Sequence, residues 1–198
     1  MDGSGLNRLL TDARGPLSWS PDGRLAAISA DDTLLALSPD GGKPTRLADA
    51  DALNADVAWS PDGRVILYYR YTGGLSSSLY FRRARHGRYG GRAFPLDGES
   101  PVFSPDGKRL ALENAGECCG GVFVARADGT MLRKLIDGGS LGDWSPDGVW
   151  LAIGDYGHGP TGTEALAVVS TDGKHVFRLT PYRQVTVYRI CWQPQRRR

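Results

Sequence analysis

One short phrase, Trp-Ser-Pro-Asp-Gly, recurs along the chain at nearly even intervals. It occurs at 19–23, 59–63 and 144–148, occurs with Phe in place of Trp at 103–107, and begins a shortened copy at 192–194. The lead aromatic residues are therefore 40, 44, 41 and 48 residues apart. A period of this size is typical of repeat architectures, in which each repeat is one supersecondary unit.

The repeated phrase has the composition of a β-hairpin turn. Pro presets the φ of the first turn position, Asp can accept hydrogen bonds from its own backbone, and Gly takes the position with positive φ. We expect the aspartates to hold their own turns. The predicted structural turn residues are Pro21, Asp22, Gly23, Pro61, Asp62, Gly63, Pro105, Asp106, Gly107, Pro146, Asp147 and Gly148.

Each interval holds enough strand-forming sequence for one propeller blade. A β-rich run follows each turn, and most intervals add a second Asp-Gly turn and an outer strand, which gives about four short strands. We therefore predict an all-β chain, a β-propeller of four recognisable four-stranded blades in a single domain, 1–198. The predicted blades span about 16–48, 56–96, 100–136 and 142–180, with Trp19, Trp59, Phe103 and Trp144 in equivalent buried places.

The two ends of the chain predict a partial fifth blade, residues 2–11 with 186–193. These pieces lack roughly two strands of a full blade. We therefore expect an open or incomplete ring and possible self-association at the incomplete blade, since unpaired sheet edges favour pairing with another chain.

The phrase Trp-Ser-Pro-Asp-Gly, together with Asp-Gly followed by Arg-Leu-Thr, resembles the WD-like repeat of TolB-type β-propellers. The resemblance covers nearly the whole chain and implies a bacterial-type, non-catalytic scaffold that binds a protein, peptide or other ligand. An alternative is a fragment of the gating propeller of a serine peptidase of the prolyl oligopeptidase type, which carries similar repeats. An enzyme that uses the central funnel is a third class, but only Tyr188 and Arg189 lie near an inner strand.

Composition limits the partner classes and the location. A net charge of +2 argues against a general nucleic-acid binder. No apolar run reaches the length of a membrane span, and the start has no basic and apolar signal segment. The location expected is cytoplasmic for the chain as written, or periplasmic or extracellular if it is a piece of a longer secreted protein.

The candidate binding residues lie on loops that strand order places opposite the Pro-Asp-Gly turns. Loops at one end of a rigid scaffold commonly carry binding residues. The candidates for ligand or partner binding are Asp31, Asp32, Arg70, Tyr71, Glu113, Glu117, Asp155, Tyr156 and His158.

No catalytic residue, metal or cofactor is predicted. The three histidines have no metal-ligand spacing. The run 138–142, Gly-Gly-Ser-Leu-Gly, matches the letters of a nucleophile elbow, but we interpret it as an inter-blade loop because no helix follows. Cys118 and Cys119 could form a vicinal disulfide, although two free thiols are favoured, and Cys191 is expected to be buried. The basic run 82–92 is interpreted as a solvated turn.

Overall fold

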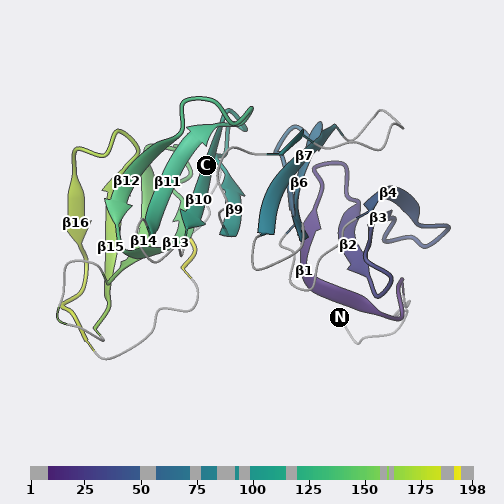
Figure 1. Cartoon of the computed structure of the whole chain (residues 1–198), viewed down its shortest axis with the longest axis horizontal. Coiled ribbons are helices and arrows are strands. Elements are labelled where there is room, and N and C mark those ends of the chain that lie inside the picture. Colours follow the sequence, from purple (N-terminus) through teal and green to yellow (C-terminus); the bar gives the residue numbers. More distant parts are fainter. Residues whose placement is uncertain are drawn as a thin grey trace, which may run out of the picture. The chain divides into compact units, whose positions relative to one another are not determined.

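The computed structural model describes residues 9–49, 57–71, 77–83, 92–93, 99–114, 120–156, 160, 163–183 and 190–192. These residues form strands and turns, with no α-helix among them. The chain divides into two compact units, Met1–Asp97 and Gly98–Arg198. Each unit holds two four-stranded antiparallel sheets, which we call blades 1 to 4 in chain order (Figure 1).

The first unit contains blades 1 and 2. Blade 1 consists of β1 (Ala13–Trp19), β2 (Leu25–Ser29), β3 (Thr33–Leu37) and β4 (Thr45–Asp49). Blade 2 consists of β5 (Val57–Trp59), β6 (Val65–Tyr71), β7 (Ser77–Arg83) and β8 (Arg92–Ala93). In both blades the strands pair in sequence order, as consecutive hairpins predict.

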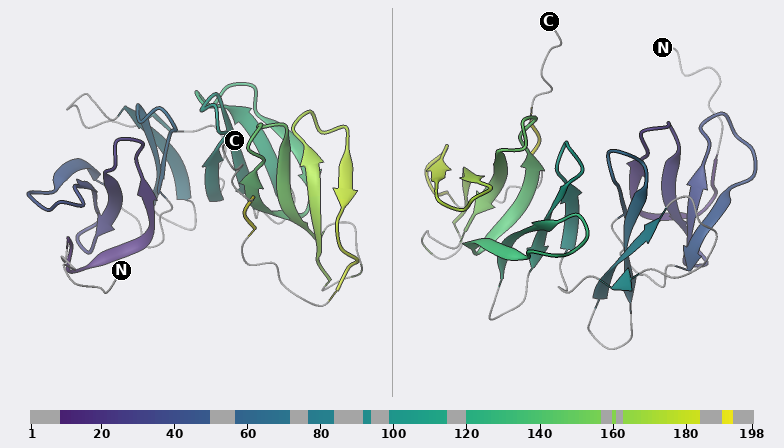
Figure 2. Two further views of the ribbon diagram at one scale, coloured as in Figure 1. Left: turned by 180° about the vertical axis from the view of Figure 1, so that it is seen from behind. Right: turned by 90° about the horizontal axis from the view of Figure 1, so that it is seen from above.

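The second unit contains blades 3 and 4, shown from two further directions in Figure 2. Blade 3 consists of β9 (Glu99–Phe103), β10 (Arg109–Asn114), β11 (Gly121–Arg126) and β12 (Arg133–Asp137). Blade 4 consists of β13 (Gly139–Trp144), β14 (Trp150–Asp155), β15 (Ala165–Ser170) and β16 (Val176–Arg178). The prediction of four four-stranded antiparallel sheets is confirmed, while their union in one domain stays a prediction.

The turn chemistry is confirmed at all four Pro-Asp-Gly triplets. Gly23, Gly63, Gly107 and Gly148 have φ values of 82°, 67°, 68° and 71°, in the left-handed region that glycine adopts without steric cost. In the turn at 60–65, Ser60 Oγ donates to Asp62 at 2.6 Å, and the same carboxylate accepts from Arg64 N at 3.0 Å. The aspartates therefore hold their own turns, as expected.

Blades 3 and 4 share a continuous apolar core. It includes Ala111, Val122, Val124 and Ile136 from blade 3 and Trp144, Leu151, Ile153, Ala167 and Val169 from blade 4. The Trp144 indole is almost fully buried there and donates from Nε1 to Val102 O at 2.9 Å. The lead aromatic residue of blade 4 is thus buried by blade 3.

The expectation that all four lead aromatic residues are buried is wrong for one of them. Trp59, Phe103 and Trp144 are buried, but Trp19 is 61% exposed. Trp59 packs on blade 1, where the Arg24 guanidinium lies 5.2 Å from its ring centroid and Ser18 Oγ accepts from Trp59 N. Trp19 belongs to blade 1 itself, and no described sheet covers its indole.

Of the predicted fifth blade, the structure describes residues 9–11 and Ile190–Trp192, and none of these residues lies in a strand. Trp192 Nε1 donates to Asp143 O at 2.9 Å, which repeats the bond from Trp144 to Val102 one blade further on. Cys191 in this segment is an exposed free thiol, so the expectation that it is buried is wrong. Residues 2–8, 186–189 and 193 of the predicted fifth blade lie outside the described residues.

Candidate functional site

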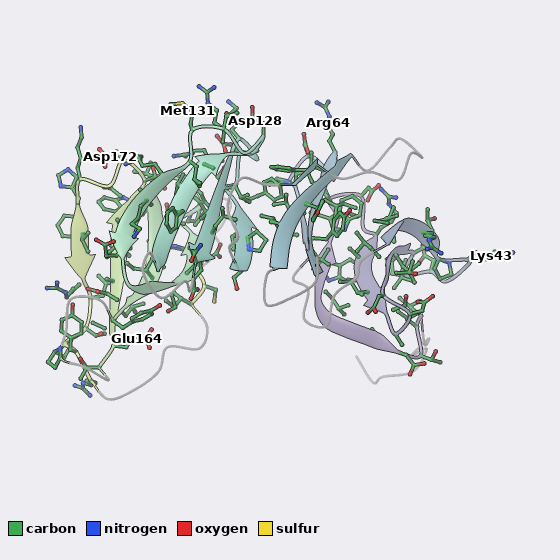
Figure 3. All side chains as sticks on the ribbon, in the orientation of Figure 1. Lys43, Arg64, Asp128, Met131, Glu164 and Asp172 are labelled. Atoms are coloured by element: carbon green, nitrogen blue, oxygen red, sulfur yellow. The ribbon has the colours of Figure 1, made fainter. Side chains whose placement is uncertain are left out.

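Polar side chains of unit 2 gather where β10 and β14 end and β15 begins. Glu113, Asp155 and Tyr156 lie at or just after the ends of these strands, and Glu164 immediately precedes β15. Figure 3 shows Glu164 at the opposite end of unit 2 from Asp128, Met131 and Asp172, which lie at the Asp-Gly turns. The predicted division of the loops between two ends of the sheets is therefore present in this unit.

Glu113 joins blade 3 to blade 4. Its Oε2 accepts a hydrogen bond of 2.9 Å from Leu141 N, a backbone donor of β13. A bond to a charged acceptor is stronger than one between neutral groups. Glu113 is therefore held in place while part of its side chain stays accessible.

Glu164 is fixed by β13 and by the chain that follows β16. Ser140 Oγ donates to Glu164 Oε1 at 3.0 Å, and the backbones of Glu164 and Arg183 exchange two hydrogen bonds. Gly154 makes room for this pair, because a Cβ at that position would lie 1.9 Å from Glu164 Oε1. Ser140 itself lies in β13, so the reading of residues 138–142 as an inter-blade loop is wrong for most of the run.

Asp155 anchors the outer end of blade 4. The carboxylate is fully buried and accepts from Arg178 Nε at 3.1 Å and from Tyr182 OH at 2.7 Å. The hydrogen bond that Arg178 donates to Asp155 raises the pKa of Arg178. Burial raises the pKa of the Tyr182 hydroxyl, and the hydrogen bond that it donates to Asp155 raises this pKa further. Asp155 thus serves the structure here and offers no accessible surface to a partner.

Tyr156 is the exposed aromatic residue of the cluster. Its side chain is 44% exposed. Partial burial is the main cause that raises the pKa of Tyr156, and the charges of Glu113 and then Glu164 add to it. The phenol therefore lies in the electrostatic field of two carboxylates that are each fixed by a hydrogen bond. This group, Glu113, Tyr156 and Glu164, is called the carboxylate–tyrosine site below.

The other predicted candidates lie elsewhere or cannot be placed. Asp31 and Asp32 belong to the β2–β3 turn of unit 1, where Ser29 Oγ donates to the Asp31 carboxylate and lowers its pKa. Arg70 and Tyr71 lie in β6, but their side chains are outside the described part of the chain, as are Glu117 and His158. The structure thus brings together Glu113, Asp155 and Tyr156.

Sequence reasoning missed Ser140, Glu164, Arg178 and Tyr182. Their meeting depends on which strand ends lie together in space. One signal was available, because a glycine inside a strand, here Gly154, marks a place where other groups approach closely.

The cluster offers no evident metal site or nucleophile. In the residues that the structure describes, no group of three or more His, Cys, Asp and Glu side chains could hold a metal ion. The Ser140 hydroxyl donates to a carboxylate, and no described histidine contacts it. Cys118, Cys119 and residues 84–91 of the basic run lie outside the described residues.

The chain is similar in sequence to known proteins over part of its own length and a smaller part of theirs. No family model matches the chain. It is 32% identical to the Tol-Pal system protein TolB of Anaeromyxobacter dehalogenans over 118 residues, which are 57% of this chain and 26% of that protein. It is 29% identical to the uncharacterized peptidase YuxL of Bacillus subtilis over 142 residues, which are 68% of this chain and 20% of that protein. The chain therefore spans about a quarter of the length of the first relative and a fifth of the length of the second.

Solved structures resemble the chain over most of its length. A putative TolB from Agrobacterium tumefaciens matches with a TM-score of 0.64 and 25% identity, over 83% of this chain and 61% of that one. TolB from Acinetobacter baumannii gives 0.68 and 18%, over 88% and 46%. The tricorn protease gives 0.63 and 14%, over 87% and 17%. The repeated Trp-Ser-Pro-Asp-Gly turn, the four-stranded antiparallel blades and these likenesses show that the chain has a TolB-like β-propeller fold.

Proposed function

We propose that the chain is a non-catalytic binding module that receives a protein or peptide partner at the carboxylate–tyrosine site. The likeness to TolB-type propellers supports a binding or scaffold role, since one relative is named as a component of the Tol-Pal system. The observation that carries the proposal is the half-exposed Tyr156 ring in the electrostatic field of two carboxylates that hydrogen bonds hold in place.

The chemistry of the site favours a basic segment of the partner. Tyrosine is enriched among residues that dominate binding energy, because its ring buries a large area and its hydroxyl can still hydrogen-bond. Glu113 is partly exposed and supplies negative charge to a partner, whereas Glu164 is buried, at 7% exposure, and adds to the negative field of the site. Such charge steers and orients a cationic partner. Their hydrogen bonds to Leu141 N and Ser140 Oγ limit the ordering cost of binding.

Site-specific cross-linking tests this proposal in the native host. A photo-reactive residue at position 156 of the full chain should capture a defined protein, and one at Met131 should not, because Met131 is exposed at the opposite end of the unit. The purified partner should then bind Tyr156→Ala or Glu113→Gln about tenfold more weakly than the wild-type chain, a loss of about 1.4 kcal/mol. Equal binding by all variants would refute the site.

A gating propeller of a serine peptidase is the second candidate function. It is supported by the partial likeness to the peptidase YuxL and by the fold shared with the tricorn protease. The test is to label the product of the complete coding region with a serine-directed fluorophosphonate. Stoichiometric labelling, lost on mutation of a serine outside residues 1–198, would favour this candidate over the scaffold.

The location and the oligomeric state also remain proposals. The likeness to TolB-type proteins supports the periplasmic location over the cytoplasmic one. No described helix has the length and apolar character needed to cross a membrane. Self-association at the incomplete blade stays a prediction, which sedimentation velocity at several concentrations would test.

A further inference from the structure

Ten Asp-Gly bonds occur in the chain, and the structure describes the aspartates of all but Asp2 and Asp97. An Asp-Gly bond is reactive, because glycine has no side chain that hinders the approach of its nitrogen to the carboxyl carbon of the aspartate. In a folded protein the reaction depends on how firmly the carboxylate and the glycine N–H are held by other groups. The described aspartates differ in this respect.

Six of the eight described aspartates are held in the same way. A serine or threonine hydroxyl two residues away donates to each carboxylate. A second donor is the backbone N–H two residues further on, or in one turn the Arg24 guanidinium. We call these the held aspartates: Asp22, Asp62, Asp106, Asp128, Asp147 and Asp172. A seventh, Asp137, pairs with Lys134 Nζ at 2.8 Å.

Asp40 is the exception among the residues that the structure describes. Its carboxylate accepts no hydrogen bond and forms no ion pair there, and Ser38 Oγ accepts from Asp40 N at 3.3 Å instead of donating to the carboxylate. The Asp40 side chain is exposed. Gly41 N donates to Ser38 O at 3.1 Å, which is longer than the corresponding bond in every turn of a held aspartate. Both reacting groups are therefore held less firmly than elsewhere.

The local sequence explains the difference. Asp40 lies in a fifth Pro-Asp-Gly triplet, 39–41, which joins β3 to β4 and is followed by a second glycine. Gly41 and Gly42 have φ values of 91° and 104°, so the chain turns the N–H of residue 42 away from the carboxylate. In the turn at 60–65 the equivalent residue is Arg64, whose N–H donates to Asp62. Figure 3 shows Lys43 pointing outward from the β3–β4 turn.

We propose that Asp40–Gly41 is the described Asp-Gly bond that isomerises in the folded protein, which makes residue 40 a site of spontaneous modification. Gly41 N loses its proton and bonds to Asp40 Cγ, while one carboxyl oxygen leaves as water and a five-membered imide forms. Water then adds to the imide at the main-chain carbonyl of Asp40, so that the chain runs through Cγ and the α-carboxylate becomes the side group. One water leaves and one enters, and no other reactant is needed.

The fold can accept this product at residue 40 more easily than at a held aspartate. Isoaspartate adds one methylene to the main chain and moves the carboxylate. At Asp62 this change would break the hydrogen bonds from Ser60 Oγ and Arg64 N, whereas the Asp40 carboxylate holds no described group in place. Chain neighbours apart, no atom lies within 4 Å of a Cβ placed at Gly41 or Gly42, so the turn has room to rearrange. The modified chain should therefore keep its blades.

The test is to age the full-length chain at neutral pH, either folded or unfolded in urea, and to locate isoaspartate by mass spectrometry of tryptic peptides. Asp40 lies in peptide 25–46 and Asp62 in peptide 47–64. In the folded chain isoaspartate should form at least about tenfold faster at 40 than at 62, a factor that corresponds to about 1.4 kcal/mol of activation free energy. In urea, where neither carboxylate is held, the two rates should become similar.

Two variants serve as matched controls. Asp40→Glu keeps the charge but would need a six-membered ring, so it should abolish isoaspartate in peptide 25–46, which also contains Asp31 and Asp32. Thr130→Val removes the hydroxyl that donates to the exposed Asp128 at 2.6 Å, so isoaspartate at 128 should form faster in this variant. The proposal does not depend on the carboxylate–tyrosine site.

Three results would overturn the proposal. Equal rates at 40 and 62 in the folded chain would show that both sites react only after unfolding. Isoaspartate that appears at a held aspartate before it appears at Asp40 would assign the modification to another turn. An unchanged rate at Asp128 in Thr130→Val, with circular dichroism showing a folded variant, would show that the hydroxyl does not protect the carboxylate.

Discussion

Arg24 of unit 1 and Arg109 of unit 2 occupy the same position of the repeat but bond differently. The carbonyl of each accepts the N–H of the serine that opens its turn, Ser20 or Ser104. Each guanidinium stacks on the lead tryptophan of the following blade, at 5.2 Å from Trp59 and 5.0 Å from Trp144. The same cation–π contact therefore joins the blades in both units.

The remaining donors of the two arginines go to different places. Arg109 reaches blade 4, where Nη2 donates to Gly148 O at 2.7 Å and Nη1 to Thr171 Oγ1 at 2.9 Å. Arg24 turns back to its own turn and pairs with Asp22, with Nη2 and Oδ2 2.8 Å apart. The turn that opens at Ser20 is one residue shorter than the one at Ser104, which brings Arg24 beside the turn carboxylate.

The lead tryptophans Trp144 and Trp59 show the same contrast, because only the indole of Trp144 forms a hydrogen bond to the preceding blade. Trp144 Nε1 donates to Val102 O, whereas Trp59 Nε1 is buried and finds no acceptor among the described residues. The arginine of this repeat position thus stacks on the next blade in both units, but its remaining hydrogen bonds go to the next blade in unit 2 and to its own turn in unit 1, where the turn is one residue shorter. The contrast predicts that equivalent substitutions in the two units have unequal effects.

The largest effect is expected for the lead tryptophans. Trp144→Ala should lower the free energy of unfolding by about 3–5 kcal/mol, because it empties a buried site and removes a hydrogen bond. Trp59→Ala should cost less, since its indole N–H has no described partner. Urea denaturation of the full chain measures both, and Trp19→Ala, at an exposed position, should change stability by only about 0.5 kcal/mol. Similar losses at 19 and 144 would contradict the difference in their burial.

Arginine substitutions should show the next largest difference. Arg109→Met keeps most of the apolar stem but loses the stack on Trp144 and two hydrogen bonds to blade 4, and the lost hydrogen bonds alone cost about 1–3 kcal/mol. Arg24→Met loses the stack on Trp59 and an exposed ion pair, which together contribute about 0.5–1 kcal/mol. Thermal unfolding of each variant gives the comparison, and a larger loss for Arg24→Met would show that the in-turn pair is the stronger contact.

Glycine substitutions test the turns themselves. Alanine in the left-handed region costs about 1–2 kcal/mol, so Gly23→Ala should destabilise by that amount, because nothing lies within 4 Å of the added Cβ. Gly148→Ala should cost more, since its Cβ would lie 3.1 Å from Arg109 Nη2 and disturb the bond to blade 4. The paired melting temperatures give the difference. Equal decreases in melting temperature for the two variants would show that the cost comes from the strained turn alone and that the hydrogen bond between the blades is not disturbed.

The smallest effect concerns acid stability. Arg24 and Ser20 donate to the Asp22 carboxylate and lower its pKa to about 2, from 3.8. A lowered pKa in the folded chain gives stability that is present above pH 3.8 and is lost as the pH falls toward 2. The gain is small because the pair is exposed to solvent.

Nuclear magnetic resonance titration checks this assignment. Arg24→Met should raise the pKa of Asp22, whereas the pKa of Asp147, which Ser145 Oγ and Val149 N–H lower, should not move. An unchanged pKa of Asp22 in this variant would assign the shift to Ser20 instead.

Local features of the fold could be predicted from the sequence, and distant contacts could not. The positive φ of Gly63 follows from the turn residues beside it, so the turn was predictable. The exposure of Trp19 depends on what lies before its blade, which the repeat does not encode locally. The same holds for Cys191, expected to be buried from its place in the repeat and found exposed.

The candidate site was predictable only in part for the same reason. Strand order placed Glu113 and Tyr156 at one end of the sheets. It could not show that Glu164 would meet Ser140, because that contact needs the side chain to fit over Gly154. It also could not show that Arg178 and Tyr182 would enclose Asp155 and leave it no accessible surface.

The hydrogen bonds of the Pro-Asp-Gly turns bear on the chemical lifetime of the protein. An Asp-Gly bond is damaged by isomerisation, in which the glycine nitrogen attacks the aspartate side-chain carbon, water leaves and a cyclic imide forms. Hydrolysis of the imide at its other carbonyl then gives isoaspartate. In the turn at 60–65, Gly63 N already donates to Ser60 O at 2.8 Å, while Ser60 Oγ and Arg64 N hold the Asp62 carboxylate. Because attack would require both groups to leave these partners, turns held in this way should resist the damage to which their sequence is prone, and isoaspartate should accumulate at them first in unfolded chains.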